Sequence, residues 1–279
     1  MIPGTTISSD ARSQMFRSIG MAALLLCCLT NVTHAEPKLR LMIGNCFNQS
    51  SSKKTSLDHE VADAVRSELG RSAGYGADQY ITIPVAEFEK AQGQLPEKDR
   101  ETVDGLRGIR SAILARLAST LKADIIVHSW YRVNFQRPAR NSVTVGIVFT
   151  HITTGDIVMY AVTTSVATSI ERAVVIAVAD SVHKCRERHI PIVGIRQRIG
   201  KTVILPIGLA AGIVVADEFI VIREVNGTQE RIGTVRVRKV STDETEADVF
   251  TEVSLMSPGD LCVHIVRLPF PGCVLPMTR

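Results

Sequence analysis

The sequence predicts an α+β protein, in which an N-terminal α/β domain with a mixed sheet and packed helices precedes a small C-terminal all-β, barrel-like domain. Up to residue 188, apolar runs alternate with stripes of helical spacing, as expected for a sheet covered by helices. Beyond residue 198, short apolar runs are separated by Gly, Asn-Gly and Pro-Gly, which predicts short strands and turns. The 279 residues are 45% hydrophobic and 22% charged, a globular composition with enough length for two domains.

These changes in the pattern of apolar and turn residues indicate the domain boundaries. The segment before the second domain is charged and contains Pro191, which favours a linker. In chain order we expect a signal peptide at 1–35, the α/β domain at 36–188, a linker at 189–198, the β domain at 199–268 and an irregular tail at 269–279.

The first 35 residues have the pattern of a secretory signal peptide. An apolar core over residues 21–29 follows the positive charge of Arg17, and small residues stand at Thr33 and Ala35. We expect cleavage between Ala35 and Glu36. The core is too short to span a bilayer stably, so an N-terminal membrane anchor is the less favoured alternative. These features predict a periplasmic or otherwise exported protein of a Gram-negative type bacterium.

Two further residues bear on the start of the chain and on lipidation. Met15 is an alternative start, which would make residues 1–14 an upstream extension. A lipoprotein signal has a small residue just before the modified cysteine, whereas Leu26 precedes Cys27. A lipid anchor is therefore not expected.

The α/β domain contains apolar runs that predict strands and apolar stripes that predict helices. The expected strands are 39–46, 80–85, 125–135, 142–152 and 157–166. The expected helices begin near Ser56, within 86–105 and near Leu106, and a fourth follows Thr168. In this last helix, Thr168 and Glu171 form a capping-box pattern at its start.

A single break separates the last two expected strands. It consists of Thr154, Gly155 and Asp156. Glycine adopts positive φ without steric cost, and Thr and Asp suit the flanks of a tight turn. We interpret this segment as a hairpin turn that makes the two strands antiparallel neighbours.

The second domain is expected to contain five short strands and to form a small barrel or sandwich. The expected strands are 202–207, 218–225, 232–240, 247–253 and 261–268.

Four cysteines remain after the signal peptide. In an oxidising compartment four cysteines allow three pairings, and Cys262 with Cys273 is the nearest in sequence. Equally, all four could be small buried hydrophobes.

The residues offer no recognisable catalytic, cofactor or metal site. His128 and His151 lie in expected strands without a nucleophile or an orienting acid in a known pattern. His183, Cys185 and His189 are near in sequence, but residues six apart do not share a helix face. We therefore expect no enzyme, no cofactor and no bound metal.

The charge pattern does not favour nucleic acid. Net charge is only +4 and aromatics make up 5%, so platforms for stacking bases are scarce. Basic residues of the second domain stand beside acidic ones, which favours an ordinary solvated sheet face over an anion-binding patch. These basic residues are Arg223, Arg231, Arg236, Arg238 and Lys239.

The stretch from Ala123 to Val166 resembles the curli secretion lipoprotein family and related TolB-N-terminal-like periplasmic domains. The matching residues are Ala123-Asp124 and the turn Thr154-Gly155-Asp156-Ile157, and the resemblance covers about residues 38–188. The second domain, with Ala216-Asp217-Glu218-Phe219 and a later Pro-Gly-Asp, resembles the C-terminal domain of flagellar assembly protein T. The loop at 136–141 is too short for the membrane-spanning hairpin of a curli channel, so a pore is not expected.

These resemblances imply a non-enzymatic exported envelope protein that acts as an assembly or scaffolding factor for a secretion or flagellar type machine. They imply protein partners, self-association into a ring and peripheral association with the outer membrane. The alternative is a regulator that binds and activates a cell-wall synthase in the periplasm.

Overall fold

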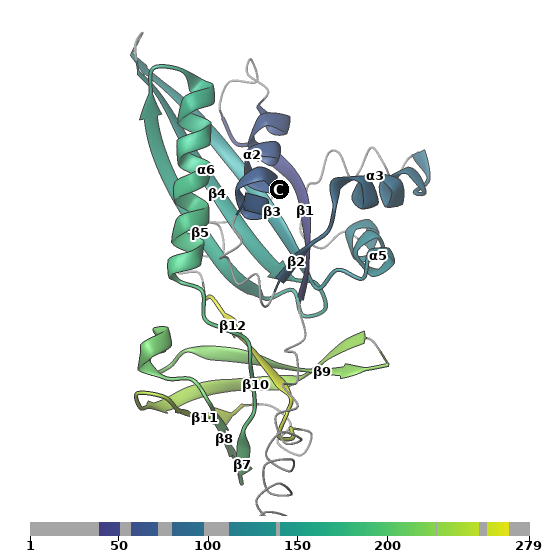
Figure 1. The fold of residues 1–279 in the computed structure, drawn as a ribbon, viewed down its shortest axis with the longest axis vertical. Helices are drawn as coiled ribbons and strands as arrows, with labels where there is room; N and C mark the ends of the chain where they lie inside the picture. The colour runs from purple at the N-terminus through teal and green to yellow at the C-terminus, as the bar shows by residue number, and fades with distance from the viewer. Residues whose placement is uncertain are drawn as a thin grey trace, which may run out of the picture. The chain divides into compact units, whose positions relative to one another are not determined.

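The computed structural model describes residues 39–50, 57–71, 80–97, 112–137, 140–226, 228–250 and 256–267. All of them belong to one compact unit, residues 38–279. They form a mixed sheet with helices and an antiparallel sheet that curls into a half-barrel (Figure 1). This confirms the α+β class. The expected cleavage site at Ala35 and Glu36, the tail and Cys273 lie outside the described residues.

The first sheet has five strands in the order β2-β1-β3-β4-β5. Strand β1 pairs in parallel with β2 and β3, whereas β3, β4 and β5 are antiparallel. The strands are β1 Leu39–Asn48, β2 Tyr80–Thr82, β3 Ile125–Arg137, β4 Arg140–His151 and β5 Ile157–Ala167.

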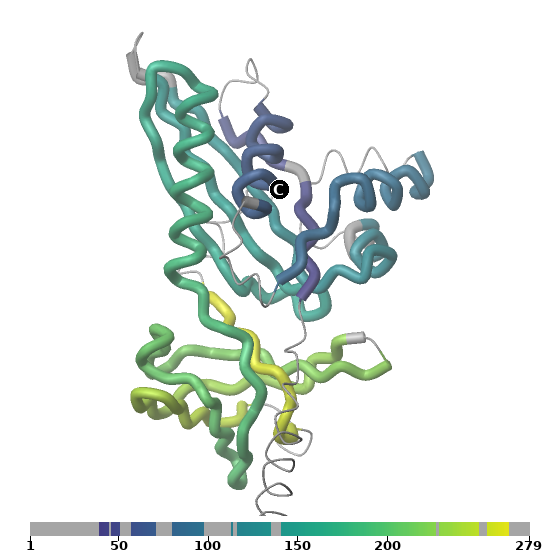
Figure 2. Tube along the Cα trace, in the orientation of Figure 1, coloured from purple at the N-terminus to yellow at the C-terminus, as the bar shows by residue number. Residues whose placement is uncertain are grey.

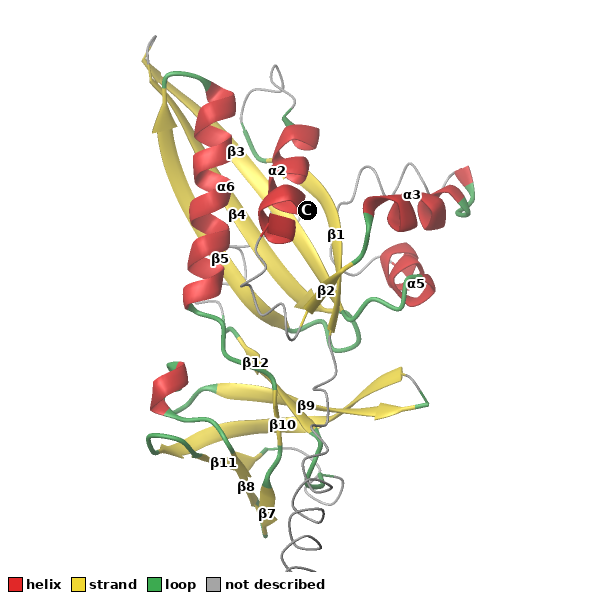
Figure 3. Ribbon diagram, viewed as in Figure 1, coloured by secondary structure: helices red, strands yellow, loops and turns green. Residues whose placement is uncertain are grey.

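Helices cover both faces of this sheet near β1 (Figure 3). The helices are α2 Asp58–Arg71, α3 Val85–Gly93, α5 Ala112–Thr120 and α6 Ile170–Glu187. Helices α2 and α6 contact each other and bury their apolar stripes on one face, in a cluster with Leu41, Ile43 and Val127. Helices α3 and α5 pack on the other face against Met42 and Ile126. Successive side chains of β1 point to opposite faces of the sheet, so this strand contributes residues to both buried clusters.

Two element boundaries differ from the sequence-based expectation. The strand expected to reach residue 85 ends at Thr82, and Pro84 precedes the first turn of α3 with φ −59°. Proline fixes φ near the helical value, so it suits a helix start as well as an edge strand. At α6 the cap is Ser169, whose hydroxyl accepts from the Arg172 N–H, so the cap lies one residue beyond Thr168.

The second sheet is antiparallel and has seven strands in the order β6-β12-β9-β10-β11-β8-β7. Strands β6 and β7 occupy part of the segment expected to be a linker, and their two and three residues are too short to give a sequence pattern. The tube in Figure 2 shows the C-terminal strand β12 beside β9, far from it in sequence. The strands are β6 Val193–Gly194, β7 Gln197–Ile199, β8 Thr202–Leu205, β9 Glu218–Val225, β10 Thr228–Val240, β11 Thr245–Val249 and β12 Leu261–Ile265.

Candidate functional site

The turn between β4 and β5 has a fixed internal geometry. The Gly155 N–H donates to the His151 carbonyl at 2.8 Å, and the His151 N–H donates to the Asp156 carbonyl at 2.9 Å. Gly155 has a φ of +70°, the region that glycine adopts at least cost. The Thr154 hydroxyl accepts from the Asp156 N–H at 3.2 Å and lies 3.3 Å from His151 Nδ1. The turn therefore fixes both the Asp156 carboxylate and the His151 imidazole.

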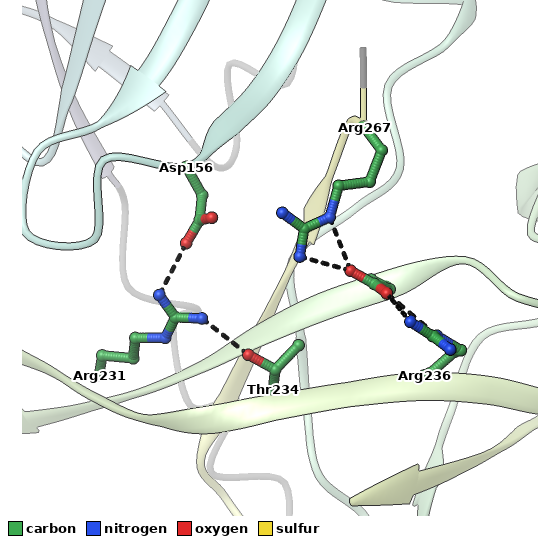
Figure 4. A network of polar contacts seen from close by, with 6 residues as sticks. Asp156, Arg231, Thr234, Arg236 and Arg267 are labelled. Atoms are coloured by element: carbon green, nitrogen blue, oxygen red, sulfur yellow. Dashed lines mark hydrogen bonds and ion pairs between the residues drawn. The ribbon is translucent and has the colours of Figure 1, made fainter. Parts of the chain in front are cut away.

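Both of these side chains contact β10 of the second sheet. Arg231 Nη1 donates to Asp156 Oδ2 at 3.1 Å, and its Nη2 donates to the Thr234 hydroxyl at 2.8 Å (Figure 4). His151 Nε2 lies 3.1 Å from Gln229 Oε1, which can only accept. Nε2 therefore carries the ring proton and Nδ1 accepts from Thr154. Burial lowers the pKa of His151, which favours this neutral form.

A second polar cluster lies where β9 begins. The Glu218 carboxylate accepts from Arg236 at 2.5 Å and from Arg267 at 2.7 Å (Figure 4). Burial alone would raise the pKa of Glu218, but the hydrogen bonds and charges of the two arginines outweigh it and lower that pKa. Next to Arg267, the Val266 N–H donates to the Ile157 carbonyl of β5 at 2.7 Å. The chain after β12 is thus bonded to the first sheet.

Apolar side chains continue the same contact. The buried cluster that contains the inner stripe of α6 also contains four residues of β9 and β12. They are Ile220, Ile222, Val263 and Ile265. Because one core includes side chains from both sheets, the polar contacts of the turn lie over a shared apolar interior. We call this region, with Asp156, His151, Gln229 and Arg231, the junction.

Sequence reasoning missed the junction. It identified the turn, but it assigned the turn no partner. Asp156 and Arg231 are 75 residues apart, and nothing local in either segment marks the other as its partner. Only a record of paired changes at the two positions could have indicated it.

The histidines that the sequence singled out do not come together. His128 on β3 is buried, and neither ring nitrogen has a hydrogen-bond partner among the described residues. Burial lowers its pKa to about 4. His183 faces solvent and lies 3.2 Å from Glu187, and His189 lies 3.2 Å from the Tyr80 hydroxyl. Within the described residues, no group of three or more His, Cys, Asp or Glu could hold a metal ion.

The described cysteines are buried thiols. Burial raises the pKa of Cys46 and of Cys185 to about 12, and it also raises the pKa of Cys262. A buried thiol with a raised pKa is a poor nucleophile. Since Cys273 lies outside the described residues, its pairing with Cys262 stays a prediction.

The basic residues of the second sheet contact acidic side chains of the same chain. Arg223 donates twice to Asp260, at 2.6 and 2.7 Å. Arg238 and Lys239 both contact Glu246, at 2.7 and 3.2 Å. A groove of about 520 Å³ beside them has mixed charges on its walls. It is lined by Arg196, Gln197, Ile199, Ile204, Lys239, Ser241, Glu244 and Glu246.

Exposed large apolar side chains include two groups that are close in sequence and that the sequence did not single out. On the outward face of α6, Val175 is 59% exposed and Ile176 38%. In the loop from β8 to β9, Leu209, Val214 and Val215 are 58%, 56% and 61% exposed. Apolar residues gathered on a surface mark sites of contact with proteins or membranes. Among the described residues, no helix is long and apolar enough to cross a membrane.

Comparison with known proteins gives no family. No family model and no curated protein matches the sequence. The LpoB C-terminal domain from Salmonella enterica is similar to 50% of this chain and 91% of its own, at 13% identity and a TM-score of 0.33. The PelC dodecamer from Paraburkholderia phytofirmans is similar over 55% of this chain and 89% of its own, at 10% identity and a TM-score of 0.34.

TolB from Acinetobacter baumannii is similar over 81% of this chain and 61% of its own, at 10% identity and a TM-score of 0.29. All three TM-scores are below 0.5, so these similarities assign no function to this chain. The resemblances to curli secretion lipoproteins and to flagellar assembly protein T stay predictions.

Proposed function

We propose that this chain is a non-catalytic binding protein of the bacterial envelope, an assembly or scaffolding factor for a secretion or flagellar type machine. The observation that carries the proposal is the outward face of α6. The inward stripe of this helix is buried, yet Val175 and Ile176 place two β-branched apolar side chains in solvent in its second turn. A surface helix normally carries polar residues at such positions, so two neighbouring exposed apolar side chains fit contact with another protein.

The support of α6 makes it a rigid binding surface. The Thr163 hydroxyl of β5 donates to the Ala177 carbonyl at 2.6 Å and lies 2.8 Å from the Ser181 hydroxyl. Its seven buried residues pack on the sheet, and its first turn is capped by Ser169. A partner that covers Val175 would therefore meet a helix that is already ordered, which keeps the entropy cost of binding low.

A pull-down from envelope extracts tests the proposal. The bait is the protein as the producing bacterium processes it, and the variant is Val175→Asp, which places a charge on the outward face. The matched control is Val215→Asp, the same change at a valine of nearly equal exposure, 61% against 59%, in another element. We expect Val175→Asp to lose the captured proteins about tenfold, because a buried carboxylate at an interface is costly, and Val215→Asp to keep them.

The identity of the captured proteins decides between the two envelope roles. Components of a secretion or motility machine support the scaffold. Cell-wall synthases, captured without such components, support the regulator instead. Equal capture by the parental chain and by Val175→Asp contradicts a binding role for α6. The mass of the bait in solution, measured in the same preparation, reports whether it self-associates.

A further inference from the structure

The loop between β8 and β9, residues 206–217, has an unusual surface. From residue 206 to residue 216 it contains only proline, glycine, alanine, leucine, isoleucine and valine. Its Ile207 and Ile213 are buried and anchor it, while Leu209, Val214 and Val215 face solvent. A protein partner usually meets an apolar centre within a rim of polar side chains. The exposed part of this loop offers an apolar surface without polar side chains.

Several backbone N–H groups of this loop donate to acceptors within the chain. The Ala216 N–H donates at 2.9 Å to a carbonyl of β10, and the Leu209 N–H donates at 2.9 Å to a carbonyl of the turn after β10. The Val214 N–H donates to Asp217 Oδ2 at 2.8 Å. The Ala211 and Gly212 N–H groups donate to carbonyls inside the loop. A backbone polar group that leaves water without a bonding partner is costly, so donors bonded within the chain lower the cost of placing this loop at the boundary of a bilayer.

The conformation that exposes the valines is held in place. Gly212 has a φ of +81° and Ala216 a φ of +76°, a region that costs an alanine about 1–2 kcal/mol. A Cβ added at Gly208 would lie closer than 3.0 Å to the carbonyl oxygens of Ser241 and Thr242, so the backbones are in close contact there. These backbone constraints hold the loop in the conformation that leaves Val214 and Val215 exposed.

The acidic side chains directly after the loop make polar contacts within the chain. Asp217 accepts from the Val214 N–H and lies 3.8 Å from His264 Nε2. Glu218, the next residue, holds Arg236 and Arg267. The two carboxylates, Asp217 and Glu218, and the two guanidinium groups, Arg236 and Arg267, balance in formal charge, so they repel neither sign of lipid.

We infer that the β8–β9 loop is a membrane-contact loop, which inserts Leu209, Val214 and Val215 into the headgroup and acyl boundary of a lipid bilayer. Three half-exposed aliphatic side chains give weak and reversible binding, on the order of that of one acyl anchor, about 10⁴ M⁻¹. Because insertion and not charge drives it, the loop-dependent binding is insensitive to salt. This inference does not rest on the proposed role of α6.

Vesicle flotation with purified protein tests it, using vesicles of phosphatidylcholine and phosphatidylethanolamine and no other protein. The variants are Val215→Asp and Leu209→Asp, and the matched control is Val166→Asp, the same change at a valine of β5 that is 54% exposed. We expect the loop variants to lower the partition coefficient at least about tenfold, because a carboxylate must now enter the bilayer boundary. The control binds like the parental chain, and high salt leaves the loop-dependent part unchanged. Unchanged binding of both loop variants, or an equal loss in the control, overturns the inference.

A second measurement reports depth directly. The chain has one tryptophan, Trp130, which is buried, so a Val215→Trp variant adds a reporter in the loop. We expect acyl chains that carry bromine to quench this added emission, and an unquenched Trp at 215 would overturn insertion. If Val215→Asp instead loses a captured envelope protein while its vesicle binding is unchanged, the loop is a protein site and the inference is wrong. Because this assay contains only lipid, its failure is distinguishable from the failure of the α6 proposal.

Discussion

Protonation of His128 is expected to make the folded protein sensitive to acid. The side chain lies in β3, buried, and no described polar atom bonds either ring nitrogen. Burial lowers its pKa from 6.5 to about 4. The imidazole is therefore neutral in the folded protein throughout the range in which the unfolded chain takes up a proton.

The sign and the size follow from linkage. Between pH 6.5 and about 4 the unfolded chain binds one proton more at this residue than the folded chain, so stability falls as the pH falls. Each pH unit within this window costs up to about 1.4 kcal/mol. From pH 7 to pH 5 the loss from His128 is about 2 kcal/mol, and below the folded pKa no further loss arises from this group.

Urea unfolding at pH 7 and pH 5 measures this loss, with the emission of Trp130 as the signal. His128→Leu removes the titrating group and keeps an apolar side chain of similar size. The pKa values of His151, His189 and His264 are also lowered, and their contribution remains in the variant. We expect the variant to lose about 2 kcal/mol less than the parental chain over the same interval. An identical loss in both proteins would refute the reasoning.

Four further substitutions test packing, the junction and the β8–β9 loop. Gly146→Ala places a Cβ closer than 3.0 Å to the indole ring of Trp130, so we expect a loss of about 1–3 kcal/mol in urea unfolding; an unchanged midpoint would show that the ring can move aside. Asp156→Asn and Arg231→Gln should show a coupling of about 0.5–1 kcal/mol in a double-mutant cycle, and additive effects would mean that the ion pair contributes nothing. Gly208→Ala should shift the β8–β9 loop and cost about 1–3 kcal/mol, with weaker vesicle binding in the same protein; parental binding by a destabilised variant would contradict the loop's role.

Periodic segments of this chain could be predicted from sequence, because their signal is local. The stripe from Ala173 to Cys185 predicts a helix packed on a sheet, and α6 buries that stripe. The expected strands at 125–135 and 142–152 correspond to β3, which extends to Arg137, and to β4, which runs from Arg140 to His151. In both cases the apolar residues that become buried form a pattern that is visible within the segment itself.

Other features depend on residues far apart in the chain. Strands β6 and β7 exist because short segments meet partners in β12 and β8, and no period is visible in two or three residues. At Pro84 the same residue suits a strand edge and a helix start, and contacts of α3 decide between them. The exposure of Val214 and Val215 could not be predicted, since an apolar run looks alike whether it is buried or exposed.

The position of β12 sets an order on folding. This strand lies between β6 and β9, and the residue after it, Val266, bonds to β5 of the first sheet. A nascent chain that has emerged only as far as residue 250 contains β9 and its neighbour β10 but lacks its other neighbour, β12. Ile220 and Ile222 then have no side chains of β12 to pack against. The second sheet is therefore completed only after the last described strand has appeared.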